Sequence, residues 1–383
     1  MTVLISGAGI AGPALAYWLT RHGRRVEIVE KAPAPRAGGY KVDVRGAAST
    51  VLGRMGLLEA ARAADTGMRQ ITYVNRRGGT IAALPADLIM GRRGDDVEIM
   101  RGDLGRILHD AAGADFRFGD SIASLADGPD GVDVTFASGR TGRYELVVGA
   151  DGLHSATRRQ VLGDVPLTHL GGHIAIFTTA NTLGIDREEL MYSEPGRLVF
   201  AYAMDPDGPA RVGMVFASPQ AEKGDGRRTV AEAFAGGGWR TGEFLAAMDR
   251  ADDFYFDSLS QVEAPRWSAG RVVLLGDAAH CPAPSSGQGT SLALVGAYVL
   301  ADALAGTGDH TAAFDAYETR MRPYVAKNMA FGRRMIKDMV PGGRLTIAFR
   351  NYGMRTLKYH PRKEQVIERV LAPLREAAEA IAI

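Results

Sequence analysis

The N-terminal stretch "TVLISGAGIAGPALAYWLTRHGRRVEIVE" constrains the fold more than any other part of the chain. A β-rich run ends in GAGIAG, an apolar helical segment follows, and a second β-rich run ends at Glu30. Gly7, Gly9 and Gly12 fill the G-x-G-x-x-G spacing, which permits a tight turn, close approach of a pyrophosphate and close packing of helix on strand. We therefore expect a Rossmann-like unit that binds a dinucleotide phosphate at the helix N-terminus.

An acidic residue ends the second β-run of this unit. Glu30 follows Gly12 by 18 residues, and an acid at that place accepts hydrogen bonds from the ribose hydroxyls of an unphosphorylated adenosine, as in FAD or NAD. Ala11 and Lys31 adjoin these residues and are assigned to the same cofactor site. The alternative is a glycine-rich turn with a surface glutamate, but the ordered strand, turn, helix, strand and acid argue against it.

Two later segments also end a β-rich run with glycine or aspartate. "YELVVGADGLHSATRR" places Asp151 just after an apolar run, and "GRVVLLGDAAHCPAPSSGQGTSLALVGAYVL" places Asp277 just after another. Between the first unit and these segments, "EIMRGDLGRIL" places Arg101 at the start of a helical pattern. A long ligand could lie across all of these points, which favours FAD over a smaller cofactor.

Composition limits the class of function. Lys plus Arg number 45 against 44 for Asp plus Glu, so no net charge draws the chain toward nucleic acid or an acidic membrane. A single cysteine, Cys281, excludes an internal disulfide and a thiolate metal cluster and favours a reducing cytoplasm. The N-terminus has no secretory pattern, and we expect no membrane span and no metal site.

The motifs and their order resemble those of the class A flavoprotein monooxygenases, the aromatic hydroxylase family that includes para-hydroxybenzoate hydroxylase and the tetracycline-inactivating monooxygenases. The likeness spans residues 1 to about 330. It implies an α/β fold with a Rossmann-like FAD-binding domain of the GR2 type, an inserted antiparallel-sheet substrate domain and a C-terminal helical tail. β-rich runs such as "HIAIFTTA", "RLVFAYAM" and "ARVGMVFAS" support the inserted sheet.

The expected division of the chain follows the motifs. The FAD-binding domain is expected in three segments and the substrate domain in two, with a C-terminal helical region after them: FAD-binding 1–70, 96–165 and 265–335; substrate 71–95 and 166–264; helical 336–383.

The resemblance also implies roles for individual residues. Asp277 would hold the ribityl and pyrophosphate region of FAD, Arg101 the flavin chain, and Glu30 the adenosine ribose. Backbone N–H groups at the N-terminus of the apolar helix would face the negative charge of a reduced flavin. Pro284 would lie by the reactive flavin face, Arg158 would support Asp151, and Arg36 would contact FAD or the NADPH phosphate. The remaining implied cofactor residues are Arg36, Asp43, Arg45, Asp151, Pro284, Gly287, Gly289 and Thr290.

The substrate domain offers one ambiguous face. In "RLVFAYAM" the bulky residues Leu198, Phe200, Tyr202 and Met204 alternate with small ones, so they share one face of a strand. The resemblance places Met191, Phe200 and Arg211 over the flavin. The alternative is that the bulky face only packs against helices of the substrate domain, and the sequence leaves both open.

The function implied is that of an FAD-dependent, NADPH- or NADH-consuming monooxygenase. It would hydroxylate a hydrophobic aromatic or polyketide-like molecule, in antibiotic biosynthesis or inactivation, through a flavin C4a-hydroperoxide formed with O2. A Baeyer–Villiger outcome would need the same residues. The chemistry is borne by the flavin, so no catalytic side chain is assigned; His280 is expected to pack, Cys281 to be inert and His154 to lie at the surface.

Two other classes of function stay open from the sequence. One is an FAD-dependent dehydrogenase or reductase that inserts no oxygen, and the other is a non-catalytic flavin-containing binding protein. We expect a monomer or weak homodimer in either case.

Overall fold

The computed structural model describes residues 2–35, 38–219, 224–357 and 359–383. The N-terminal unit is as expected: β1 (Thr2–Ser6), α1 (Ala11–Arg21) and β2 (Arg25–Glu30) form the strand, helix and strand. Around β1 lies a six-stranded sheet of order β17-β18-β11-β1-β2-β7, parallel except at its β17 edge. The other strands are β7 (Asp115–Phe118), β11 (Leu146–Gly149), β17 (Ser268–Ala269) and β18 (Val272–Leu274). The α/β fold class is confirmed.

Helices bury this sheet and one another. α10 (Gly289–Gly306) packs against α1, α2 (Ala47–Arg54) and α11 (His310–Met339). By length and composition alone, α10 is apolar enough to cross a membrane. However, 61% of that helix is buried inside the fold, because it forms the central core of the domain rather than an isolated span.

Smaller elements surround the parallel sheet. A three-stranded antiparallel sheet covers part of it, and a two-stranded ribbon pairs two segments from the first third of the chain. The elements are β8 (Ile122–Gly128), β9 (Gly131–Phe136), β10 (Thr141–Tyr144), β3 (Lys41–Val44), β6 (Val97–Met100), α3 (Leu58–Ala63), α5 (Arg101–Ala111), α6 (Ala156–Leu162), α9 (Asp277–His280) and a 3-10 turn at Pro284–Ser286.

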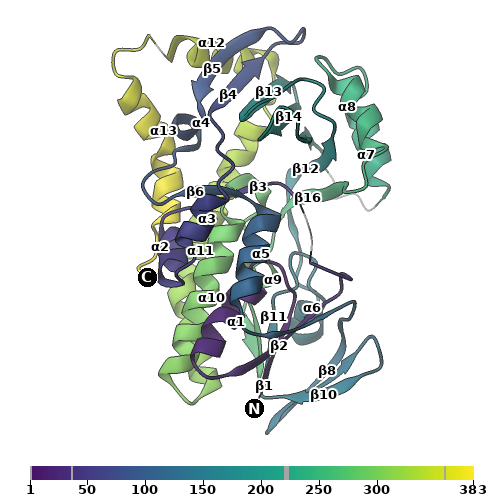
Figure 1. Ribbon diagram of the computed structural model, residues 1–383, viewed down its shortest axis with the longest axis vertical. Coiled ribbons are helices and arrows are strands. Elements are labelled where there is room, and N and C mark those ends of the chain that lie inside the picture. The colour runs from purple at the N-terminus through teal and green to yellow at the C-terminus, as the bar shows by residue number, and fades with distance from the viewer. Residues whose placement is uncertain (1, 36–37, 220–223, 358) are drawn as a thin grey trace.

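A seven-stranded sheet of order β16-β12-β15-β14-β13-β4-β5 forms the other half of the molecule (Figure 1). Its pairs are antiparallel except β13 with β4, which run parallel. The strands are β4 (Gln70–Val74), β5 (Thr80–Pro85), β12 (Thr168–Thr179), β13 (Glu188–Glu194), β14 (Arg197–Ala203), β15 (Ala210–Ala217) and β16 (Tyr255–Gln261). The sheet therefore joins residues 70–85 to residues 168–261 in one layer.

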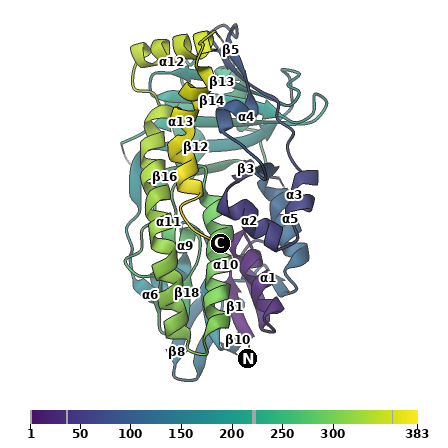
Figure 2. The same cartoon turned by 90° about the vertical axis from the view of Figure 1, so that its left-hand side faces the viewer.

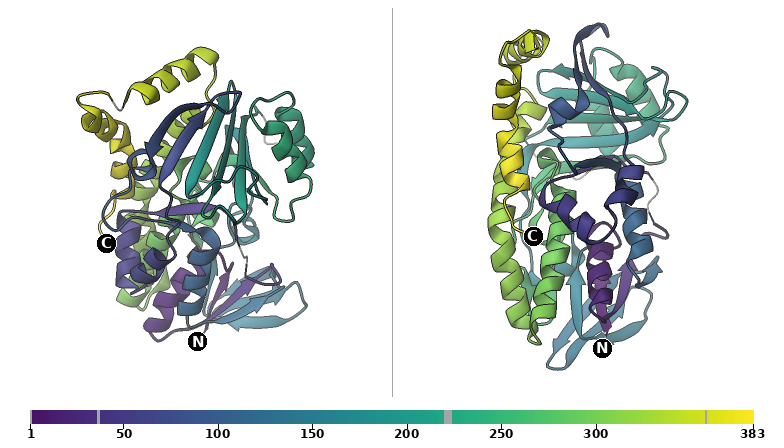
Figure 3. Two further views of the ribbon diagram at one scale, coloured as in Figure 1. Left: turned by 45° about the horizontal axis from the view of Figure 1, so that its top comes forward. Right: turned by 60° about the vertical axis from the view of Figure 1, so that its left-hand side comes forward.

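α11 runs along both halves of the molecule, as Figure 2 shows. After it, α12 (Arg344–Leu357) crosses the far end of the seven-stranded sheet, and α13 (Lys363–Ala378) returns alongside α11 (Figure 3). α4 (Ala86–Met90) lies between β5 and the ribbon. The expected C-terminal helical tail is thus present and folds back onto the rest of the chain.

The two faces of the seven-stranded sheet differ in what covers them. Val199, Ala201 and Ala203 pack into a core with α7 (Gly226–Ala233) and α8 (Thr241–Met248). Phe200 and Tyr202 belong instead to a cluster with Met100 of the FAD-binding half. Helices of the substrate domain thus cover the small residues, and the bulky face looks toward the FAD-binding half.

Candidate active site

The glycine-rich loop after β1 is fixed by close backbone contacts. Gly7 has φ +112°, and a Cβ on it would lie 2.4 Å from the carbonyl oxygen of Ala150. A Cβ on Gly12 would lie 2.0 Å from the carbonyl oxygen of Gly7. Neither position tolerates a side chain. Gly9 is different, because its open side faces the guanidinium of Arg101, whose Nη2 is 3.6 Å from the place of a Cβ.

Glu30 braces this loop. Its carboxylate accepts a 2.9 Å hydrogen bond from the backbone N–H of Ala8 and another of 2.9 Å from that of Ala32. An ionised carboxylate accepts about four hydrogen bonds. The remaining capacity of Glu30 suits a ribose diol beside the loop, while its two backbone bonds fix the orientation.

Asp277 is the first residue of α9, which follows strand β18. Its side chain is accessible to solvent although protein surrounds it closely, and this enclosure raises the pKa of the carboxyl group, whereas the nearby Arg101 guanidinium lowers it. A Cβ on Gly289, at the start of α10, would lie 3.8 Å from Asp277 Oδ1. Gly9, Arg101, Asp277 and the N-terminus of α10 therefore meet at one place.

The loop from Pro282 to Gln288 is held from behind by α11. Ser285 Oγ donates a 2.9 Å hydrogen bond to the carbonyl of Gly332, and Ser286 Oγ accepts a 3.0 Å bond from the N–H of Gln288. Gly287 has φ +63°, which favours glycine. Beyond it, the first N–H groups of α10, those of Gly289 and Thr290 included, have no intrahelical acceptor.

These features fit FAD on physical grounds. A pyrophosphate suits the Gly-rich loop with the N-terminus of α1 and Arg101, and an anionic ring edge suits the N-terminus of α10. The accessible yet enclosed carboxylate of Asp277 needs donors, which ribityl hydroxyls provide. Ala11 packs beneath the same place, since a Cβ on Gly276 would lie 3.2 Å from its methyl group. Lys31 is exposed beside Glu30.

Asp43 and Arg45 lie in a separate buried network. Arg45 pairs with Asp43 at 2.5 Å and donates to the carbonyl of Met90 at 2.5 Å. Arg92 lies 3.8 Å from Asp43 and 2.7 Å from Glu98. The described contacts of Asp43 and Arg45 lead to these residues rather than to Asp277, so the structure does not bring this pair to the cluster above. Arg36 lies outside the described residues.

Asp151 caps a helix in this structure. Its carboxylate accepts hydrogen bonds from Ser155 Oγ at 2.5 Å and from Thr157 N and Oγ1, each at 3.0 Å, at the start of α6. Arg158 on α6 donates to the carbonyls of Ala278 at 3.0 Å and Leu153 at 2.7 Å. Arg158 thereby ties the Asp151 loop to the helix that begins with Asp277.

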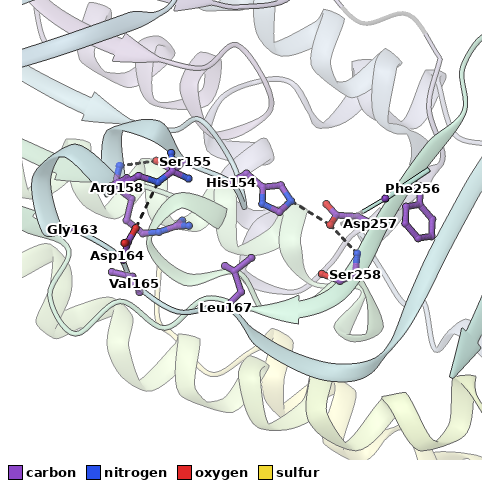
Figure 4. Close-up of a pocket in the computed structure, with 12 residues that line it drawn as sticks. His154, Ser155, Arg158, Gly163, Asp164, Val165, Leu167, Phe256, Asp257 and Ser258 are labelled. Carbon is purple, nitrogen blue, oxygen red and sulfur yellow. Dashed lines mark hydrogen bonds and ion pairs between the residues drawn. The ribbon is translucent and has the colours of Figure 1, made fainter. Parts of the chain in front are cut away.

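A pocket of about 390 Å³ opens beside this loop (Figure 4). His154, Arg158 and Arg159 line one side of it, and β16 contributes Asp257 and Ser258. His154 Nε2 lies 3.3 Å from Asp257 Oδ1 across the pocket. Arg158 and Arg159 supply positive charge for an anionic ligand, while Asp164 and Asp257 add negative charge to the same pocket.

The bulky sheet face brings the expected substrate residues together. Met191 pairs with Phe200 and Tyr202 pairs with Arg211 in the antiparallel register, so the members of each pair share a face. The Phe200 ring packs directly on Gly213, where a Cβ would lie 1.9 Å from it. Met191, Phe200 and Arg211 are therefore on the face that looks toward the FAD-binding half.

Two tyrosines near Asp277 escaped the sequence analysis. The rings of Tyr40 and Tyr255 are 6.1 Å apart, and desolvation by the surrounding protein raises the pKa of both phenols, with Arg101 opposing the shift at Tyr40. Tyr255 Oη donates to Asp257 Oδ2 at 3.3 Å. Alternation in "FYFDSLSQV" could have placed Tyr255 and Asp257 on one face, but Tyr40 follows a glycine pair in a segment without periodicity.

His280 and Cys281 both lie buried in the fold. His280 is fully buried with its ring 4.5 Å from that of Trp267, and burial lowers its pKa to about 4. Burial raises the pKa of the Cys281 thiol well above its usual value, which favours the protonated thiol and is in keeping with the expected inert role. No cluster of three potential metal ligands occurs among the residues that the structure describes.

The chain was compared with known proteins. A family model described as "FAD binding domain" matches residues 1–332. A relative named "Flavin-dependent monooxygenase", from an unknown prokaryotic organism, is 40% identical over 338 residues, covering 86% of this chain and 88% of the relative. The solved structure of the tetracycline destructase Tet(55) is 36% identical with a TM-score of 0.86, covering 99% of this chain and 97% of that one. Tetracycline destructase Tet(51) is 32% identical with a TM-score of 0.85 and covers 100% and 98%.

Proposed function

The chain belongs to the FAD-binding-domain family and is an FAD-dependent monooxygenase, and from this premise we propose that it hydroxylates a hydrophobic, polycyclic aromatic molecule at the expense of NAD(P)H. One observation carries the proposal. Gly9, Arg101, Asp277 and the N-terminus of α10 converge on the side toward which the Phe200 face of the large sheet looks. A flavin held there would face this apolar wall.

We propose the following roles toward FAD. Glu30 accepts from the adenosine ribose, Arg101 neutralises phosphate charge, and Asp277 accepts from ribityl hydroxyls. The N–H groups of Gly289 and Thr290 would stabilise negative charge on the flavin, with Gly287 and Pro284 shaping the approach. Bound FAD supplies the chemistry of two-electron reduction and reaction with O2, while the chain orients the substrate and excludes water.

The substrate class follows from the wall and from the comparisons. Met191, Phe200 and Tyr202 present a broad apolar surface, and Arg211 lies beside Tyr202 with a charge that can pair with an acidic or enolic oxygen. The solved structures reported above include two tetracycline destructases. We propose a tetracycline or another fused-ring polyketide of similar size as the substrate.

The pocket beside Asp151 is the place that we propose for NAD(P)H. Its His154, Arg158 and Arg159 suit a pyrophosphate or a ribose phosphate, and Asp257 connects it to Tyr255 in the substrate space. Arg159→Ala should raise KM for NADPH about tenfold and leave FAD content unchanged. The matched control is Arg228→Ala, because Arg228 is an exposed arginine on α7. If the KM for NADPH is unchanged in both variants, NAD(P)H does not bind in this pocket.

The decisive experiment is a screen of fused-ring polyketides for stimulated NADPH oxidation, followed by mass spectrometry of the product formed under ¹⁸O2. A product heavier by one ¹⁸O atom supports hydroxylation. Substrate oxidation or reduction without label would establish a dehydrogenase or reductase. Tight binding of the compound without NADPH oxidation would establish a binding protein.

Location and assembly remain predictions. The single cysteine is a buried thiol, in keeping with the cytoplasm that we propose. A monomer or weak homodimer is the expected state, to be measured by light scattering.

A further inference from the structure

The exposed apolar side chains of the described residues gather on the C-terminal helices. Outside α12, α13 and their connection, Tyr255 alone among the large hydrophobic residues that the structure describes is exposed. On α12, the exposed fractions of Leu345, Phe349 and Tyr352 are 76%, 76% and 69%. Large apolar side chains grouped in this way on a surface indicate an interaction site.

α12 is apolar on two opposite sides. Met354 and Leu357 pack inward onto the cluster that contains Tyr202, which anchors the helix on β5 and β13. Leu345, Phe349 and Tyr352 follow one another at helical spacing on the opposite side. The contacts of the inner side hold α12 in place, whereas the apolar side chains on the outer side do not contribute to this anchoring.

Basic residues outnumber acidic residues in α12, α13 and the segment that connects them. From Arg344 to Leu371 the sequence has seven Lys and Arg residues and only two acidic ones, Glu364 and Glu368. On α13, Glu364 and Glu368 line a pocket with Leu371 and Arg375, and Glu368 pairs with Arg93 and Arg375.

The outward side of α13 is therefore apolar and basic. Val366 and Val370 are exposed, at 39% and 67%, and helical spacing places Lys363 and Arg369 beside them. On α12, Arg344 and Arg355 are exposed next to the apolar stripe. On α13, helical spacing places Glu364 and Glu368 on the side opposite Val366 and Val370, so near charge balance over the whole chain conceals a local basic surface.

We propose that this outward surface of α12 and α13 docks the enzyme on an anionic lipid surface. Apolar and aromatic side chains flanked by Lys and Arg are what an interfacial helix presents to a membrane, and tyrosine suits the water boundary of lipid. α12 lies across one end of the elongated molecule (Figures 1 and 2), so a flat surface can reach its outer side. The same surface on a second copy would bring like charges together, which disfavours self-association.

The test is flotation of the purified FAD-loaded enzyme with vesicles. We expect it to float with an equal mixture of phosphatidylcholine and phosphatidylglycerol but not with phosphatidylcholine alone. Binding should be strong in about 0.1 M salt and weak in about 1 M salt. Phe349→Ser and Arg355→Glu should each lower the partition coefficient roughly tenfold. Arg228→Glu on α7, which changes the charge equally, should not lower it.

Three results would overturn the proposal. One is failure of the wild-type enzyme to float with anionic vesicles, and another is equal binding of all variants. The third is a concentration-dependent dimer that Phe349→Ser abolishes in the absence of vesicle binding, which would assign the surface to a second copy. FAD content and NADPH oxidation, measured in every variant, establish that the protein is folded. Neither readout depends on the identity of the substrate.

Discussion

Ser285 in the loop before α10 donates a 2.9 Å hydrogen bond to the backbone carbonyl of Gly332 in the C-terminal third of α11. A Cβ on Gly332 would lie 2.3 Å from the carbonyl oxygen of Pro282. The long helix and the proposed flavin loop therefore touch backbone to backbone. Gln261 at the end of β16 joins them, because its Nε2 donates to the carbonyls of Pro282 and Met329.

This contact predicts that α11 sets the position of the flavin loop. Gly332→Ala should displace the loop and weaken FAD binding at least about tenfold, and Ser285→Ala, which loses one hydrogen bond of about 1 kcal/mol, should weaken it about fivefold. Fluorescence titration of the FAD-free protein measures both. The control is Gly105→Ala in the middle of α5, where no atom lies within 4 Å of the added methyl group. Equal FAD affinity in Gly332→Ala and Gly105→Ala would contradict the prediction.

Asp277 is expected to favour FAD binding at the expense of stability. Enclosure raises its pKa in the folded protein above 3.8, so between that pH and the raised value the folded state binds more protons than the unfolded state. The unfolding free energy of the FAD-free protein then falls as the pH rises through this window. Asp277→Asn should raise the melting temperature of the FAD-free protein at pH values above the window.

The same variant should bind FAD poorly. Loss of a charged hydrogen bond of about 1.5–3 kcal/mol corresponds to roughly 10- to 100-fold weaker binding. A purified Asp277→Asn protein with full flavin occupancy would remove Asp277 from the site. A lower melting temperature without FAD would show instead that the carboxylate supports the fold.

Phe200 is expected to act on the substrate rather than on stability. Phe200→Ala removes a half-buried ring from the face opposite α7 and α8, so we expect a raised KM and peroxide release without product. Val199→Ala, on the other face of the same strand, is the control. Val199 is 2% exposed in the core with those helices, and its truncation should cost roughly 2 kcal/mol with normal kinetics of the folded enzyme. If Phe200→Ala still couples NADPH oxidation to product formation normally, Phe200 does not line the substrate pocket.

Because His280 is buried, we expect the folded protein to lose stability as the pH falls. Its pKa is lowered from 6.5 to about 4 by burial, so the unfolded state binds more protons between these values. This contribution to stability is fully present above pH 6.5 and is lost as the pH falls toward 4, by at most about 1.4 kcal/mol per pH unit. His280→Gln should flatten the melting temperature over this range. An unchanged pH dependence would assign acid sensitivity to other groups.

The sequence by itself determined the parts of the protein that depend on local geometry. The spacing of Gly7, Gly9 and Gly12 between a strand and a helix permits one turn, and the structure has it. The period of two in "RLVFAYAM" placed Phe200 and Tyr202 on one face, and the register agrees. The ordered motifs also identified the family. These inferences need only neighbours in sequence and the preferences of the backbone.

Only the tertiary structure decided which distant groups meet. Whether the bulky face met helices or the FAD-binding half depended on where α7 and α8 packed. The burial of α10, the contact of Gly332 with the loop and the ion pair between Glu368 of α13 and Arg93 are likewise long-range. Periodicity predicts which residues share a face. Which element covers that face depends on the free energy of packing of the whole chain, and a local segment of sequence carries no information about distant elements.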